Sequence, residues 1–275
     1  MVMVFKGFRD AVASAALELR RLKGKFDVKH DIEPLIDNIE VRLKPKPGKK
    51  FSGEARIVFT ALKTLAEEVA EGQLPSLDDL GPLIVAGEAL ESTGTYRGLV
   101  KWAVSKVRPP SLSSVAEAYV IGGNAILEMA FKMGGTGVAT SKDPRPLEII
   151  FEKSFTRGLS IKLINAEIEG ITGAVDRPIG ALMLLSPAFW ALSDPSELIR
   201  KTYAILEPGG YTAFILPLRD RRDQVNPLEP FVVISGGRPS PTLDDFQSQL
   251  LLEGYESIKV SKRDPLYCVV ARKRR

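Results

Sequence analysis

Four short polar or glycine-containing segments could do chemistry, and each follows an apolar run of the sequence. They span residues 122–124, 141–143, 165–167 and 186–189. Glycines let a backbone turn tightly and approach a ligand closely, whereas carboxylates and hydroxyls offer it hydrogen-bond partners. The chain has one histidine and one cysteine, so we expect neither a histidine-rich nor a structural zinc site, and no metal centre. These segments predict a site that binds a polar ligand.

The elements that must position these segments alternate along the chain from residue 115 onward. Apolar strand-like runs cover 118–121, 137–140, 159–164, 179–185 and 211–216, and helical patterns cover 125–132, 146–157 and 196–206. Such alternation predicts a parallel sheet covered by helices on both faces. Ligands of these sheets bind at the carboxyl ends of the strands, so the four segments are expected around one crevice. A helix over 243–253 and two closing strands, 255–260 and 267–271, would add an antiparallel last strand.

The first 112 residues have a different pattern and are expected to form a mainly helical N-terminal domain. Helical stripes of apolar residues cover 8–22, the segment from Ser52 to Gly72, and 96–107. Ser76 is expected to cap a further short helix, with two aspartates in its first turn, where negative charge suits the helix dipole. The sequence Arg-Pro-Pro-Ser at 108–111 breaks the last helix. We therefore predict two domains, 1–112 and 113–275.

The bulk composition indicates an ordinary globular protein, with 44% hydrophobic and 26% charged residues and a net charge of +4. Basic and acidic residues are mixed along the chain, so this excess alone does not indicate nucleic acid. No apolar run approaches the roughly 20 residues of a membrane helix. The apolar run at the N-terminus is too short for a signal peptide, so a cytoplasmic protein without a membrane partner is expected. The scarcity of Asn, Gln, Cys and His favours a thermophilic source.

Residues from about 115 to 275 resemble a class I S-adenosylmethionine-dependent methyltransferase domain. The strongest match is the sequence LMLLSPAFWALSDP at 182–195, followed by ILEPGG at 205–210. These runs are similar to the family's fourth strand, the turn and helix after it, and its "vLkPGG" turn. The segments 252–256 and 266–272 are similar to the family's last helix end and last two strands. The resemblance implies a Rossmann-like, doubly wound, mostly parallel seven-stranded sheet with an antiparallel last strand, and it does not extend to the small helical domain that precedes this sheet.

The resemblance also implies which residues hold S-adenosylmethionine. The expected cofactor-binding residues are Gly122, Gly123 and Asn124 at the methionine end, Asp143 at the ribose, Glu167 at the adenine, and Ser186. Pro187, Phe189 and Trp190 are expected to border the methyl-acceptor pocket. No catalytic residue is assigned, because the sulfonium is already activated and the protein need mainly align donor and acceptor.

The cofactor motifs depart from the family pattern, in which a G-x-G-x-G loop follows a strand that carries an acid. Here Val120 is read as standing in the place of that acid, and the loop from Gly122 reads GGNAI, a degenerate form. Each site residue also has a second interpretation. The glycines could form a tight turn, Asp143 could start a helix, Glu167 could be a solvated loop charge, and the two aromatic residues could lie in a core or interface.

Two functions from different classes follow. The first is a methyltransferase that uses S-adenosylmethionine on an unknown acceptor, a small molecule or RNA. The alternative is a non-catalytic methyltransferase-like protein that binds a partner or RNA. Basic segments at 44–50, 219–222 and 272–275 would support an RNA partner, but each is also typical of a solubilising loop or tail. The oligomeric state is left open, a homo-oligomer included.

Overall fold

A computed structural model describes residues 10, 12–15, 17–18, 53–110, 113–175, 177–188, 194–224, 226, 228–235, 237 and 240–275. The predictions for the basic segment 44–50, for most of the first helical stripe, and for Phe189 and Trp190 lie outside these residues. No helix in the described part of the chain is long and apolar enough to cross a membrane.

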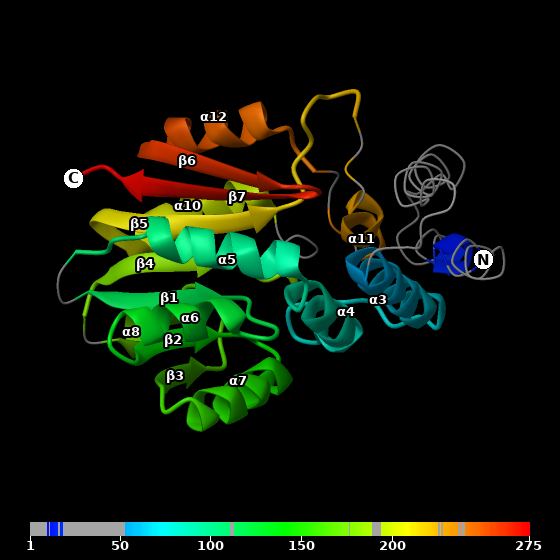
Figure 1. The fold of residues 1–275 in the computed structure, drawn as a ribbon, viewed down its shortest axis with the longest axis horizontal. Coiled ribbons are helices and arrows are strands. Elements are labelled where there is room, and N and C mark those ends of the chain that lie inside the picture. The colour runs from blue at the N-terminus through cyan, green and yellow to red at the C-terminus, as the bar shows by residue number, and fades with distance from the viewer. Residues whose placement is uncertain are drawn as a thin grey trace.

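A seven-stranded sheet forms the centre of the molecule, in the order β3-β2-β1-β4-β5-β7-β6 (Figure 1). Its first five strands run parallel: β1 (Ser114–Ala118), β2 (Thr136–Thr140), β3 (Ser160–Ile164), β4 (Ile179–Leu184) and β5 (Leu206–Leu216). Strand β7 (Leu266–Lys273) pairs antiparallel with β5 and with β6 (Tyr255–Arg263). The predicted Rossmann-like sheet with an antiparallel last strand is confirmed.

Helices cover both faces of the sheet. In Figure 1, α5 (Gly94–Lys106) and α6 (Asn124–Lys132) lie in front of it and α10 (Pro195–Ile205) lies behind. The remaining helices of this region are α7 (Pro144–Thr156), α8 (Gly170–Ala174), α11 (Glu229–Ile234) and α12 (Leu243–Glu253). Because both faces are covered, the central strand β4 is buried at every position, which explains its unbroken apolar sequence.

Two helices from the N-terminal part of the chain lie at the edge of the sheet where the parallel strands have their carboxyl ends. They are α3 (Gly53–Ala70) and α4 (Gly81–Glu91), which pack against each other. Helix α5 follows them in the chain and packs against β6 and β7. It therefore lies on the sheet, although the sequence assigns it to the front domain. The division of the chain after residue 112 stays a prediction.

The prediction of a first strand at 118–121 was wrong, because β1 ends at Ala118. Tyr119, Val120 and Ile121 follow the strand and are almost or fully buried. A short buried run has no periodicity that separates a strand from a packed loop, so these three apolar residues were read as part of the strand.

A turn prediction and a helix-cap prediction also differ from the structure. Strand β5 already begins at Leu206, and Pro208-Gly209-Gly210 forms an irregularity inside it, with φ of 81° at Gly209. The Ser76 hydroxyl accepts a hydrogen bond from the amide of Asp79 at 2.9 Å. It closes a turn there, and the next helix, α4, begins only at Gly81.

Candidate functional site

Strand β1 carries a buried acid at its carboxyl end. Glu117 is fully buried, and its Oε2 accepts a hydrogen bond from the amide of Ile126, in the first turn of α6, at 2.8 Å. The acid of the first strand is therefore Glu117. The prediction that Val120 stands in the place of this acid was wrong, and it followed from the misplaced strand.

The loop between β1 and α6 carries side chains where a glycine-rich loop has none. Tyr119 and Gly123 are left-handed, with φ of 56° and 66°, and they are four residues apart, like the outer glycines of G-x-G-x-G. Ile121 then stands at the middle glycine, and it is fully buried. The loop keeps a glycine-like backbone, but two of the three glycine positions hold large side chains. Left-handed φ is costly for a tyrosine, so the packing around it must hold this conformation.

Glu91, the last residue of α4, reaches this loop from the front part of the chain. Its Oε1 accepts from the Gly122 amide at 3.3 Å, and its Oε2 accepts from Asn124 Nδ2 at 3.1 Å. The Ser186 side chain lies close enough to the same carboxyl group to lower its pKa. A Cβ on Gly122 would lie 2.5 Å from Glu91 Oε2, so a larger residue at this position would have to displace the Glu91 carboxyl group. Three residues predicted to hold a cofactor instead converge on a carboxylate of the chain itself.

Glu91 and Glu117 form a buried pair of carboxyl groups. Burial raises the pKa of Glu91 to about 7, against the opposing effects of the Gly122 amide and the charge of Lys153. Burial, and then the nearby charge of Glu91, raise the pKa of Glu117 well above its usual range. The two groups cannot both ionise cheaply in this environment, so protonated carboxyl groups persist here near neutral pH.

Asp143 is the N-cap of α7, the second of its two interpretations. It is 1% exposed, and it accepts hydrogen bonds from the amide of Arg145 at 2.9 Å and from the amide of Leu80 at 2.6 Å. The guanidinium of Arg145 pairs with the same carboxylate. Burial raises the pKa of Asp143, but the hydrogen bonds from Arg145 and Leu80 hold it below its usual value. The acceptor oxygens that were predicted to bind ribose are already occupied.

The remaining predicted residues are placed as follows. Glu167 is 38% exposed and pairs with Lys142 at 3.3 Å, and Lys142 also pairs with Asp78 at 2.5 Å. Ser186 and Pro187 are buried at the end of β4. Phe189 and Trp190 lie outside the described residues, so the methyl-acceptor pocket stays a prediction.

Helix α4 and the residue before it contact the predicted cofactor residues and their neighbours, from Asp143 to the loop at Gly122. Before it, the Leu80 amide binds Asp143; within it, Gly87 contacts Ile121 and Glu88 pairs with Lys153 at 3.0 Å. Lys153 in turn donates to the Gly122 carbonyl at 3.0 Å. The short helix expected after Ser76 was not predicted to extend to Glu91, so the role of this residue was missed. The one available signal was an acidic residue closing the apolar run PLIVAGEALE at 82–91.

In this arrangement, residues of the chain engage groups that were expected to hold S-adenosylmethionine. The loop amide and the acid after β2 are hydrogen-bonded by residues of the chain, and Tyr119 and Ile121 fill space that glycines would leave open. For metals, no group of three or more His, Cys, Asp or Glu side chains among the described residues is placed to hold an ion.

Comparison with solved structures shows the class I methyltransferase fold. The CurJ carbon methyltransferase matches with a TM-score of 0.64 at 11% identity, over 100% of this chain and 92% of its own. The mitomycin 7-O-methyltransferase MmcR matches with a TM-score of 0.53 at 13% identity, over 81% of this chain and 69% of its own. The S-adenosylmethionine-dependent methyltransferase SibL matches with a TM-score of 0.51 at 17% identity, over 98% of this chain and 77% of its own. At these identities the likeness concerns the fold. Neither a protein-family model nor a curated protein sequence matches the chain.

Proposed function

We propose that this chain is a non-catalytic protein with a methyltransferase fold, whose own helix α4 takes the place of the cofactor and which acts by binding a partner. One observation carries the proposal: the carboxylate of Glu91 is bound by the backbone and side-chain groups that were expected to hold S-adenosylmethionine. In this proposal the chain keeps the methyltransferase fold, and Glu91 of the chain itself occupies the expected cofactor site.

Movement of α4 alone would not restore the glycine-rich loop of the family pattern or free Asp143. If α4 withdrew, Tyr119 and Ile121 would still stand at glycine positions, and Asp143 would still cap α7 and pair with Arg145. The departure would also strip the Gly122 amide and the Asn124 amide group of their buried acceptor, which costs about 1–3 kcal/mol for each group left unpaired.

Isothermal calorimetry and thermal melting with S-adenosylmethionine and S-adenosylhomocysteine test this proposal. We expect no heat and no change in melting temperature at millimolar ligand. A ligand present at 100 times its Kd would stabilise the folded chain by about 2.7 kcal/mol, so real binding could not escape detection. A clear, saturable thermal shift would contradict the proposal.

A second candidate is an S-adenosylmethionine-dependent methyltransferase in which α4 leaves the crevice when the cofactor enters. It is favoured by three buried oxygens without a hydrogen-bond partner among the described residues: Glu117 Oε1, Thr140 Oγ1 and Ser141 Oγ. They lie at the carboxyl ends of β1 and β2, where ligands of such sheets bind, and unpaired buried polar atoms are costly. This candidate expects binding in the same titration, weakened by Glu117→Gln, and transfer of a labelled methyl group to an acceptor.

A further inference from the structure

The segment between Glu91 and Glu117 contains no acidic residue and four basic ones: Arg97, Lys101, Lys106 and Arg108. Most of this segment is helix α5. Arg97 and Lys101 are four residues apart and exposed, so they lie on one face of the helix, away from the buried side that packs on the sheet. Arg108 follows the helix and is also exposed.

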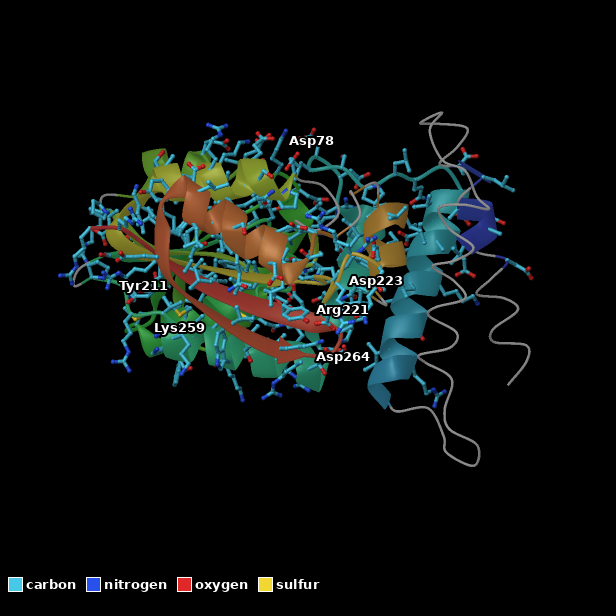
Figure 2. The ribbon with its side chains drawn as sticks, turned by 90° about the horizontal axis from the view of Figure 1, so that it is seen from above. Asp78, Tyr211, Arg221, Asp223, Lys259 and Asp264 are labelled. Atoms are coloured by element: carbon cyan, nitrogen blue, oxygen red, sulfur yellow. The ribbon has the colours of Figure 1, made fainter. Side chains whose placement is uncertain are left out.

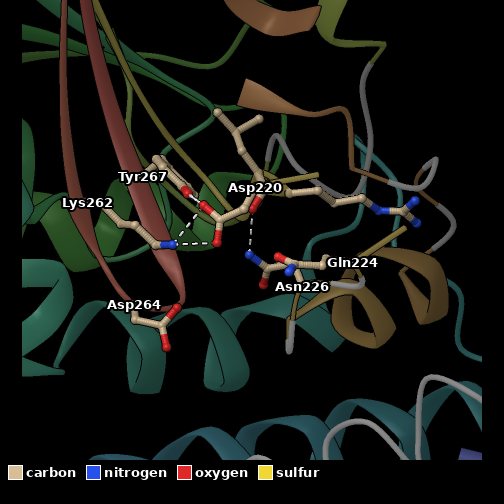
Figure 3. Close-up of a pocket in the computed structure, with 8 residues that line it drawn as sticks. Asp220, Gln224, Asn226, Lys262, Asp264 and Tyr267 are labelled. Carbon is tan, nitrogen blue, oxygen red and sulfur yellow. Dashed lines mark hydrogen bonds and ion pairs between the residues drawn. The ribbon is translucent and has the colours of Figure 1, made fainter. Parts of the chain in front are cut away.

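The edge strand β6 brings further cations to this helix. The Arg263 side chain lies against α5 at Gly98, where a Cβ would be 3.0 Å from Arg263 Nε. Side chains alternate along a strand, so Lys259 points to the same side as Arg263, and Figure 2 places Lys259 toward the α5 side of β6. Lys262 points to the other side, where it pairs with Asp220 at 2.6 Å (Figure 3).

Another pair of cations stands at the far end of α5. Lys132, near the end of α6, donates a hydrogen bond to the Val104 carbonyl of α5. Partial burial and then the charge of Arg108 lower the pKa of Lys132. Two cations are thus held close enough to repel each other, and this cost would be offset by a bound anion.

We call the exposed side chains of Arg97, Lys101, Arg108, Lys132, Lys259 and Arg263 the basic face. Within the described part of the chain, none of the six forms an ion pair. Four cations elsewhere differ from these six, since Lys142, Arg145, Lys201 and Arg272 pair with carboxylates. The basic face therefore keeps its charge available for a partner.

We propose that the basic face binds the phosphate backbone of a single-stranded nucleic acid. Unpaired lysine and arginine side chains bind phosphates by releasing the counterions around them. Helix α5 has 13 residues and is about 20 Å long, a length that spans several phosphates. The cations lie on α5, on the connection after it, on α6 and on β6, and a flexible strand can bend to follow all of them.

An exposed aromatic ring supports a single strand as the partner. Phe131 is the neighbour of Lys132 and is 75% exposed. Proteins that bind single strands combine a cationic path with aromatic rings on which unpaired bases stack. The bases of a duplex are not available for such stacking. The surface is separate from the crevice, so this inference stands or falls independently of the proposed function.

Fluorescence anisotropy with a labelled 20-nucleotide single-stranded RNA, the same DNA strand and its duplex tests the proposal. We expect the full chain to bind both single strands more tightly than the duplex, with affinity that falls as KCl rises from about 50 to 200 mM. The triple variant Arg97→Ala/Lys101→Ala/Lys259→Ala should bind at least about 10-fold more weakly, and its salt slope should fall by about 2, that is, about 0.7 for each phosphate contact. Phe131→Ala should weaken binding about 5-fold or more.

The matched control is Arg56→Ala/Arg157→Ala/Arg200→Ala, which removes the same charge from exposed positions on α3, after α7 and on α10. It should change the affinity less than about 2-fold apart from a small general charge effect. The proposal is overturned if the wild-type chain does not bind single strands at 50 mM KCl, if it prefers the duplex, if the control loses as much affinity as the triple variant, or if polyglutamate or phosphatidylserine vesicles compete as well as unlabelled RNA.

Discussion

Helices α4 and α5 are neighbours in the chain, with only Ser92 and Thr93 between them, yet they place their charges in opposite ways. Helix α4 turns Glu91 into the crevice, where it is 1% exposed. Helix α5 buries apolar residues such as Leu99 and turns Arg97 and Lys101 to solvent. A buried charge must be fully hydrogen-bonded to be tolerated, whereas an exposed charge is tolerated without partners. The charged residue at the end of α4 is therefore used in contacts within the fold, whereas the charged residues of α5 are exposed and available to the proposed partner.

The largest effect is expected from Glu91→Ala. It removes the acceptor for the Gly122 amide and the Asn124 side chain and leaves a cavity in a buried site, so the free energy of unfolding should fall by about 3 kcal/mol. The matched control is Glu88→Ala on the same helix, whose carboxylate is 39% exposed and whose loss should cost at most about 1 kcal/mol. Urea denaturation measures both. Equal losses would mean that Glu91 is not the anchor of α4.

A smaller effect is expected from pH. The pKa of Glu91 rises from 4.5 in the unfolded chain to about 7 in the fold, so the folded state binds the extra proton between these values. Stability from this group is present below about pH 4.5 and is lost as pH rises through 7, with a slope of up to about 1.4 kcal/mol per pH unit. Melting curves from pH 4.5 to 8 measure it. Glu91→Gln should flatten the decline, and an unchanged profile in this variant would assign the titration to another group.

The smallest effect on stability is expected from Lys101→Ala. This exposed side chain has no ion pair among the described residues, so the free energy of unfolding should change by less than about 0.5 kcal/mol. Urea denaturation again measures it. A larger loss would show that α5 needs its cations for folding, and the contrast between the two helices would disappear.

The periodicity of the sequence was sufficient to predict most of the sheet and its helices. The helix over 243–253 matches α12 at both ends, because Thr242 caps its start and a left-handed Gly254 closes it. These are local signals with a local cause. The helix-start interpretation of Asp143 was available for the same reason, since an aspartate before a proline is a common N-cap pattern.

The content of the crevice could not be predicted in this way. The hydrogen bond from Gly122 to Glu91 joins residues 31 positions apart, and the one from Leu80 to Asp143 joins residues 63 positions apart. Nothing in the sequence around an acid at the end of a helix indicates that it will be buried against a distant loop. The family resemblance made this harder to see, because it assigned the same loop and the same aspartate to a cofactor.

The turn between α4 and α5 couples these two helices, so that they are expected to move away from the loop together. The Thr93 hydroxyl donates to the Leu90 carbonyl at 2.8 Å and accepts from the Tyr96 amide at 3.2 Å, so it closes one helix and starts the next. Helix α4 cannot swing away from the loop without pulling on the first turn of α5. In hydrogen–deuterium exchange, the amides of Gly122 and Tyr96 should then lose protection together, as members of one cooperative segment. A single-stranded nucleic acid bound to the outer side of α5 would then slow hydrogen exchange at the Gly122 amide, although it would not contact that amide.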